Sequence, residues 1–336
     1  MLPASRIRSV LLIGLAMVLV AWGALGLALA HVDSAVPLDV EHSTLVLTDD
    51  AARIKGQEST LTHQSHISLL DPHDQDSVTV RVGETWLQAE AAEPGATDSA
   101  AATAAGTDLD RLLGAQITVY RMDRRSGAAV GPALVVDQLA APNQEVPLDG
   151  VWTKFPAATE EKTYDFYDST ARTAFPAEYR GKQQRDGRTL LTFSQDIKPV
   201  NVATLYNSYR TTTTITPQPT EDNPEPAPEQ AYLFHSAQRT ITVDQLTGMI
   251  VDFEEKVHDY YATREDAAAG GPTEDLLDFH ATMAPEASQA LLEQAAQIHT
   301  GNTLTIVHWG MVGVGVVLAA VGLAGAVGRL STTKKR

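Results

Sequence analysis

The sequence predicts an α+β protein, mainly β, built of antiparallel sheets or a barrel-like sheet with a membrane-proximal helix and two flanking transmembrane helices. Three observations predict this class. Two uncharged apolar segments, residues 9–30 and 304–328, bracket the chain. Between them, residues 31–303 are polar and carry β-branched, alternating stretches that are typical of strands. Near the end of this region the apolar spacing becomes helical.

The two apolar segments predict a two-pass plasma-membrane protein. Each has the ~20 apolar residues that a helix needs to cross the hydrocarbon core of a bilayer. Short basic flanks stay cytoplasmic, so residues 1–8 and 329–336 are expected inside and residues 31–303 outside. Trp22 and Trp309 fall near the outer ends of the segments, where aromatic rings favour the interface.

The N-terminal segment leaves two possibilities open. Its apolar run is longer than the 7–15 residues typical of a secretory signal, which favours a retained signal anchor. However, Ala28-Leu29-Ala30 matches the small-residue pattern of a signal-peptidase site, and a cleaved signal peptide is the alternative. Both outcomes place the central region outside.

Charge and cysteine content exclude several classes of function. The chain has 25 basic and 42 acidic residues, and without the six basic residues of the two tails 19 basic residues face 42 acidic ones, a net charge of −23. Such a surface repels phosphate, so no nucleic acid is expected as a partner. The chain has no cysteine, which excludes disulfides, cysteine catalysis and cysteine-ligated metals.

The central region is expected to fold largely as hairpins. Turn residues at 123–127, 186–187 and 244–248 separate pairs of β-branched stretches. We expect strands at 43–48, 77–82, 116–121, 132–136, 178–180, 189–193, 239–243 and 248–253. Residues 90–107 lack periodicity and residues 216–230 contain five prolines, so both are expected as exposed loops.

A helix is expected at about residues 273–299. Glu274 and Asp275 favour a helix start, since acidic residues interact well with the positive end of the helix dipole. Apolar residues from Leu276 to Ile298 then recur at helical spacing, with a break at Pro285.

No motif predicts catalysis or a metal site, so the protein is interpreted as a non-enzyme with no cofactor. Walker loops, nucleophile elbows and zinc-protease motifs are missing from the sequence. His63 and His66 are three residues apart, but on a strand an odd spacing sends them to opposite faces. They are interpreted as solvated polar residues rather than metal ligands.

Aromatic and charged residues are densest between Trp152 and Asp168. Such a mixture is typical of a binding cleft, and equally of aromatic packing in a sheet core with charges outside, and both interpretations stay open.

Three motifs resemble the actinobacterial membrane proteins of domain of unknown function 3068, the PorA-type porin family. They are Lys154-Phe155-Pro156 with Glu161-Lys162-Thr163-Tyr164 and Tyr167-Asp168, the Asp123-Arg124-Arg125-Ser126-Gly127 turn, and Thr247-Gly248-Met249-Ile250-Val251-Asp252. With the two-span organisation, the resemblance covers nearly the whole chain. The central motif implies a set of candidate ligand-binding residues: Trp152, Lys154, Phe155, Tyr164, Tyr167 and Asp168.

The resemblance implies a cell-envelope membrane protein, and its exported domain is expected to bind or conduct an apolar or lipid ligand. The organisation is also similar to that of CD36-type scavenger receptors, although a shared architecture does not carry function. The alternatives are an assembly partner in an envelope complex, or a porin-like channel formed by several copies. Glycines in the second apolar segment offer a face for a homo-oligomer. That segment has only Thr305 and His308 as polar residues, which argues against a conducting helix bundle.

Overall fold

The structure is a computed structural model that describes residues 4–30, 43–89, 111–137, 143–217, 219, 221, 224–263, 273–298 and 302–327. The chain divides into two compact units, one of residues 1–35 with 298–336 and the other of residues 36–297. The expected loop at 90–107 lies outside the described residues, as do the expected tail at 329–336 and the first three residues of the N-terminal tail.

The first unit is a pair of antiparallel helices, α1 (Ala4–Ala30) and α3 (Asn302–Val327). Glycines bring the two helices close together. A Cβ atom at Gly23 would lie 2.7 Å from a methyl carbon of Val312, and one at Gly26 would clash with the ring of His308. A search of the described residues found no helix with the length and apolar character needed to cross a membrane. The two predicted transmembrane helices are therefore not confirmed.

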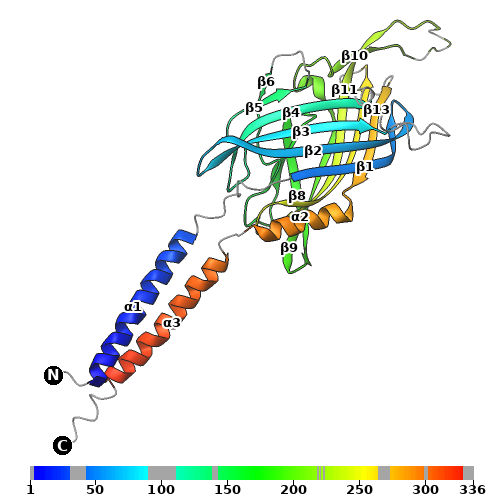
Figure 1. Cartoon of the computed structure of the whole chain (residues 1–336). Helices are drawn as coiled ribbons and strands as arrows, with labels where there is room; N and C mark the ends of the chain where they lie inside the picture. Colours follow the sequence, from blue (N-terminus) through cyan, green and yellow to red (C-terminus); the bar gives the residue numbers. More distant parts are fainter. Residues whose placement is uncertain are drawn as a thin grey trace, which may run out of the picture. The chain divides into compact units, whose positions relative to one another are not determined.

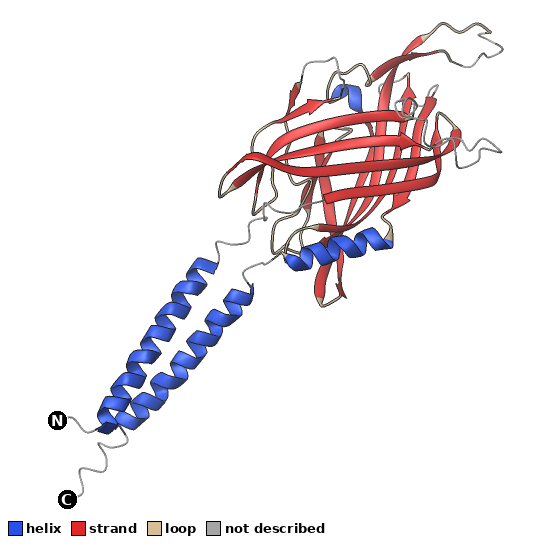
Figure 2. Cartoon of the chain, in the orientation of Figure 1, coloured by secondary structure: helices blue, strands red, loops and turns tan. Residues whose placement is uncertain are grey.

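The second unit is dominated by one antiparallel sheet, which confirms the mainly β prediction (Figure 2). Its strands follow the order β6-β5-β4-β3-β2-β1-β13-β12-β11-β9-β8-β7, and β10 pairs with β11. The strands are β1 (Ser43–Ile54), β2 (Gln57–His73), β3 (Ser77–Gln88), β4 (Leu112–Asp123), β5 (Ala133–Val136), β6 (Gln144–Val146), β7 (Tyr164–Asp168), β8 (Thr173–Arg185), β9 (Arg188–Asn201), β10 (Thr212–Ile215), β11 (Glu229–Asp244), β12 (Ile250–Ala262) and β13 (Thr273–Thr282). The turn η1 (Val202–Thr204) and helix α2 (Pro285–Gln297) complete the unit.

Strands β1–β4 cross in front of β8 and β11–β13 in Figure 1, and the main core fills the space between these two parts of the sheet. Val151 links the segment after β4 to the edge strand β7. It forms one bridge with Ala128, just after β4, and another with Phe166 of β7. The segment that follows, Lys154-Phe155, is held against the β11–β12 turn, since the Phe155 N–H donates to the Gly248 carbonyl oxygen over 2.7 Å. The aromatic segment is therefore central to the fold.

All three predicted hairpins form, as β4–β5, β8–β9 and β11–β12. The described residues of 216–228 contain no helix or strand, so the proline-rich segment is the loop between β10 and β11. The prediction of a helix at about residues 273–299 is wrong for its first part. Residues 273–282 form strand β13, and helix α2 spans only Pro285–Gln297. The physical reason is a β-bulge: Asp259 pairs with Leu277 and Tyr260 with Asp275, so Leu276 is an extra residue. The bulge breaks the alternation that identifies a strand.

Candidate ligand-binding cavity

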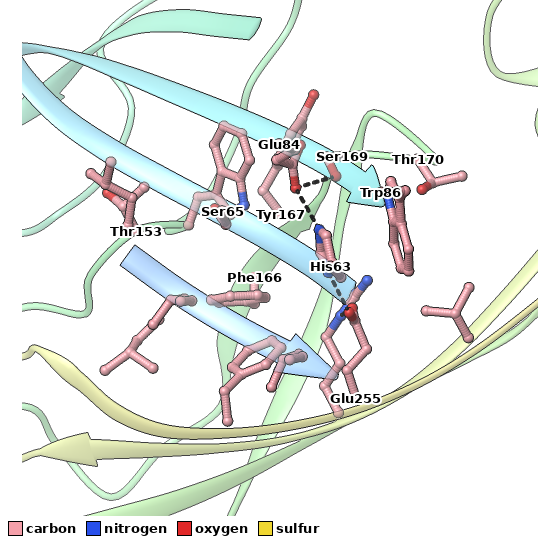
Figure 3. A pocket seen from close by; sticks show the side chains of 18 residues that line it. His63, Ser65, Glu84, Trp86, Thr153, Phe166, Tyr167, Ser169, Thr170 and Glu255 are labelled. Atoms are coloured by element: carbon pink, nitrogen blue, oxygen red, sulfur yellow. Dashed lines mark hydrogen bonds and ion pairs between the residues drawn. The ribbon is translucent and has the colours of Figure 1, made fainter. Parts of the chain in front are cut away.

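A cavity of about 60 Å³ lies between strands β1–β3 and strands β7, β11 and β12 (Figure 3). One part of its wall is apolar. Successive inward-facing positions of β1, β2 and β12 contribute to it, as the two-residue period of a strand requires. The apolar lining consists of Leu45, Leu47, Ile67, Trp152, Phe166, Ile250, Phe253 and Val257.

The other part of the wall is polar and charged, and it centres on His63 of β2. The His63 Nδ1 atom lies 3.0 Å from Glu255 Oε2, and Nε2 lies 3.8 Å from Glu84 Oε1. Ser169 Oγ donates to the same Glu84 oxygen over 3.0 Å. The indole of Trp86 stacks on the His63 ring with centroids 4.0 Å apart and so fixes the plane of the imidazole. Figure 3 shows His63 of β2, Glu84 and Trp86 of β3, and Glu255 of β12 converging on this part of the cavity, with Ser169 from the turn after β7.

An ion-pair network continues from the cavity wall into the core. Arg239 of β11 lies 2.6 Å from Glu255 and 2.7 Å from Asp168, and Asp168 lies 3.2 Å from the Nε2 atom of His235. His235 Nδ1 in turn lies 2.6 Å from Asp259. Charges buried this deeply are tolerated because each has an opposite charge within hydrogen-bonding distance.

The network shifts the pKa values of its members. Burial alone would lower the pKa of His63, but the hydrogen bond to Glu255 and the nearby Glu84 carboxylate raise it to about 9. Burial opposes charge at His235 as well, yet Asp168 and Asp259 raise its pKa to about 10. Against the effect of burial, His235 and Arg239 lower the pKa of Asp168, and Arg239 with His63 lowers that of Glu255 to about 2. Both histidines are therefore cations at neutral pH.

Two polar atoms at the cavity lack hydrogen-bond partners. Within the described part of the chain, four buried side-chain atoms are in this position, and two of them, His63 Nε2 and Tyr167 Oη, belong to cavity-lining residues. Tyr167 is only 1% exposed. Buried polar groups are almost always satisfied in folded proteins, by the protein or by ordered water. His63 Nε2 faces the Glu84 carboxylate at 3.8 Å, so the Tyr167 hydroxyl is the atom at the cavity that has neither a hydrogen bond nor an ion pair.

The structure brings only some of the predicted site residues to this cavity. Trp152 and Tyr167 line it, and Asp168 lies behind it in the ion-pair network. Phe155 is fully buried in the core, where Tyr164 packs against it with ring centroids 5.3 Å apart. Lys154 does not reach the cavity either.

Lys154 instead binds the backbone of the β4–β5 turn. Its Nζ atom donates to the carbonyl oxygens of Arg124 and Arg125 at 3.3 and 3.2 Å, in the β4–β5 turn. Burial lowers the pKa of Lys154 to about 8, although Asp123 opposes the shift. The six candidate residues thus combine core and turn residues with two residues of the cavity wall, Trp152 and Tyr167.

Sequence reasoning missed the polar part of the wall: His63, Glu84, Trp86, Ser169, Arg239 and Glu255. His63 and His66 do occupy a strand, but the interpretation of His63 as a solvated residue was wrong, because its side chain is only 12% exposed and bonded to Glu255. His66 on the opposite face bonds the exposed Thr44 hydroxyl. The alternation of β2 holds the available signal, since His63, Ser65 and Ile67 share one face.

This arrangement is suited to binding a molecule with an apolar and a polar part. One part of the cavity presents an apolar wall, while the Tyr167 hydroxyl offers a donor at the other.

Comparison with known proteins identifies the family. The model of the family described as "PorA: Porin PorA" matches residues 8–324. A protein of Corynebacterium resistens named "Porin PorA" is 22% identical over 320 residues, covering 77% of this chain and 74% of its own length. Another of the same name, from Corynebacterium amycolatum, is 25% identical over 146 residues, which cover 43% of this chain and 36% of its own. The chain belongs to the Porin PorA family.

Proposed function

We propose that this chain is a cell-envelope membrane protein whose β domain binds an amphipathic ligand in the cavity of Figure 3. The observation that carries the proposal is the pairing of an apolar wall with the buried Tyr167 hydroxyl, which has no hydrogen-bond partner among the described residues. A ligand with an apolar part and a polar group would satisfy both at once. The role is binding and transfer rather than catalysis.

The size of the cavity sets the form that the ligand must take. At about 60 Å³, the cavity is smaller than the ~150 Å³ cavities that admit a benzene molecule. It therefore suits the polar group and the first few carbons of a ligand, and a longer apolar part would need the cavity to open. We expect an elongated ligand to extend beyond the cavity.

The membrane location rests on the family and on the helix pair. The matched relatives are named porins, a name that implies an envelope membrane protein. Both helices of the pair expose large apolar side chains on their surface, which suits contact with lipid. These residues are Leu11, Leu15, Val18, Leu25, Ile306, Val316, Val317 and Leu323. With basic residues outside both apolar segments, the positive-inside rule favours cytoplasmic termini and an exported β domain.

Native mass spectrometry of the full-length protein, purified in detergent, tests ligand binding. The expected result is a bound amphiphile that survives purification and is absent from a variant with a filled cavity, Ser65→Phe. Gln64→Phe is the matched control, because Gln64 precedes Ser65 in β2 and its side chain is on the opposite face. Wild-type protein that carries no amphiphile and takes up none from mixed micelles would contradict the proposal.

The absence of native cysteine makes the topology directly testable. Single cysteines at Gly187, in the β8–β9 turn, and at Thr332, near the C-terminus, can be labelled with a membrane-impermeant maleimide on intact cells. Labelling at residue 187 alone is expected. Equal labelling at both positions without permeabilisation would rule out the two-pass orientation.

A channel is the second candidate, because the named relatives are called porins. One chain offers a small cavity between packed strands, so conduction would require several copies of the helix pair. Purified protein in planar bilayers should then produce discrete conductance steps. Currents at background level over a range of protein concentrations would remove this alternative.

A further inference from the structure

The polar part of the cavity is specific enough to restrict the chemistry of its ligand, provided that the proposed binding function is correct. Four charged residues contribute to the lining: His63, Arg239, Glu84 and Glu255. They comprise two cations and two carboxylates, and the ion pairs of His63 and Arg239 with Glu255 already neutralise much of their charge. A charged ligand group would find no uncompensated partner, and its desolvation would be unfavourable.

The Tyr167 hydroxyl, which has no partner among the described residues, indicates which neutral group fits. It can donate one hydrogen bond, whereas both ring nitrogens of His63 already face carboxylates, Nδ1 at 3.0 Å from Glu255 and Nε2 at 3.8 Å from Glu84. Burial raises the pKa of Tyr167, so its hydroxyl keeps its proton. The neighbouring Glu84 carboxylate, which already accepts from Ser169, would repel an anionic acceptor. An uncharged oxygen acceptor meets all of these conditions.

We propose that the cavity binds the neutral oxygen-bearing end of an amphiphile, an ester carbonyl or a hydroxyl group, through Tyr167 Oη. The first carbons of the apolar part lie against Phe166, Phe253 and Leu47. Amphiphiles that end in a carboxylate or a quaternary ammonium are discriminated against. The Trp86 ring does not form a cation site, because its face is covered by His63 at 4.0 Å.

Intrinsic fluorescence can measure this selectivity. Trp86 and Trp152 line the cavity, and replacing Trp22 and Trp309 by Phe in full-length protein leaves only these two indoles to report. The probes are three amphiphiles of equal chain length, a monoacylglycerol, the corresponding fatty acid and the alkyltrimethylammonium. We expect the monoacylglycerol to bind at least about tenfold more tightly than either charged probe.

Two tyrosine variants separate the hydrogen bond from general packing. Tyr167→Phe should weaken monoacylglycerol binding about five- to tenfold, the usual effect of one lost hydrogen bond, and leave the binding of the charged probes unchanged. Tyr164→Phe is the control, since the Tyr164 hydroxyl accepts from the Glu160 N–H away from the cavity. Equal affinity for all three probes would overturn the head-group proposal while supporting the binding function. No saturable binding of any probe would overturn both.

A different observation, in the strand pairing, identifies a route into the cavity. β1 pairs with β2 at ten positions, but with β13 only through Arg53–Asp278 and Ile54–Leu277. Further along, the His280 N–H donates to the Asp49 carboxylate at 2.7 Å instead of to a strand carbonyl. β13 ends at Thr282, so the part of β1 that carries the cavity residues Leu45 and Leu47 has no paired residue of β13.

Helix α2 packs beside β1 in this part of the domain. It directly follows β13 and contacts both β12 and β1, and its buried residues Leu291, Leu292 and Ala295 join the main core. Polar contacts from the β8–β9 hairpin hold it, with Arg185 donating to Ser288 Oγ at 3.1 Å and to Gln289 Oε1 at 3.0 Å. The geometry points to the part of β1 that is not paired with β13, beside α2, as the passage through which an elongated ligand enters and from which its apolar part extends.

A reversible crosslink tests the passage in the full chain. A disulfide between Asp49→Cys and His280→Cys would tie β1 to β13, and we expect it to slow monoacylglycerol exchange at least about tenfold, with recovery on reduction. Thr48→Cys with Thr62→Cys is the matched control, because these hydroxyls lie 3.1 Å apart between β1 and β2. Unchanged exchange in fully crosslinked Asp49–His280 protein would overturn the passage, whereas a slowdown in the control pair would show a general stiffening of the sheet and overturn it as well.

Discussion

Arg239 and Asp168 form an ion pair of 2.7 Å in the interior of the β domain, with side chains only 8% and 0% exposed. The pair connects the cavity wall, through Glu255 and His63, to His235 and its second carboxylate Asp259. It also ties the family motif that ends in Asp168 to β11, the strand on which Arg239 lies. The network thereby fixes the position of the polar cavity wall.

Replacing Arg239 by Met should destabilise the domain by about 3–5 kcal/mol, because Asp168 and Glu255 would then be buried beside each other without their common partner. The measurement is the free energy of unfolding of the full-length protein in detergent, followed by near-UV circular dichroism. Arg180→Met is the control, since Arg180 pairs with Glu178 at the surface, and a change below about 1 kcal/mol is expected there. Equal losses in the two variants would contradict the assigned role of the network.

Stability should fall as the pH rises from 6.5 to 8. The pKa values of His63 and His235 are raised to about 9 and about 10, so their stabilisation is complete below the unfolded pKa of about 6.5 and is lost toward the folded values. The expected loss by pH 8 is about 2–3 kcal/mol. Above pH 8, Lys154 opposes the trend because its folded pKa is lowered to about 8.

The acidic limb of the same profile has the opposite cause. The lowered pKa values of Asp168 and Glu255 mean that their stabilisation is present above pH ~4.5 and is lost as the pH falls toward 2. Unfolding midpoints in denaturant between pH 2 and 8 should therefore be highest near pH 5–6. A profile that is flat from 6.5 to 8 would argue against buried histidine cations.

Gly248→Ala should destabilise the domain by about 2–4 kcal/mol. Gly248 has φ +76°, a conformation that favours glycine. A Cβ atom at this position would collide with the carbonyl oxygen of Phe155, and this backbone atom cannot move aside as a flexible side chain can. Gly187→Ala is the control, with φ +74° but no atom within 4 Å of its Cβ, and backbone strain alone should cost about 1 kcal/mol. Thermal unfolding of both variants measures the difference. If the two losses are equal, the contact of the turn with Phe155 contributes nothing.

Gly26→Ile should separate helices α1 and α3. The ring of His308 occupies the space that a Cβ at Gly26 would need, whereas Gly14 has no atom within 4 Å of such a position. A disulfide between Val20→Cys and Gly315→Cys reports the contact, because a Cβ at Gly315 would lie 2.7 Å from a methyl carbon of Val20. Crosslinking should fall several-fold with Gly26→Ile and persist with Gly14→Ile. Crosslinking that persists in both variants would contradict the close contact between Gly26 and His308.

Much of the fold could be predicted from the sequence where one strand face is apolar and the other polar. Val78, Val80 and Val82 show this alternation in β3, and glycine turns marked the hairpins. The region of His63 and His66 was treated as strand, but the bounds of β2 were not predicted. Its inner face carries His63 and Ser65 at the cavity, so the polar lining removes the contrast on which the pattern depends. β13 resembled a helix because of its bulge at Leu276.

The candidate site was predicted only in part. Trp152, Tyr167 and Asp168 stood out as members of one dense local motif. Their partners Arg239 and Glu255 follow at a distance of more than 70 residues, and only the long-range pairing of β11 and β12 with the rest of the sheet brings them together. Local spacing contains no information on such contacts, so Lys154, Phe155 and Tyr164 were grouped with the site although they stabilise the core and the turns.

Quenching of Trp86 and Trp152 by an amphiphile brominated on its first chain carbons tests ligand binding at the cavity most directly. In full-length Trp22→Phe/Trp309→Phe protein, both remaining indoles line the cavity. We predict saturable quenching with one ligand per chain, which Ser65→Phe abolishes and Gln64→Phe retains. Quenching that never saturates, or that is identical in the two variants, would contradict binding in this cavity.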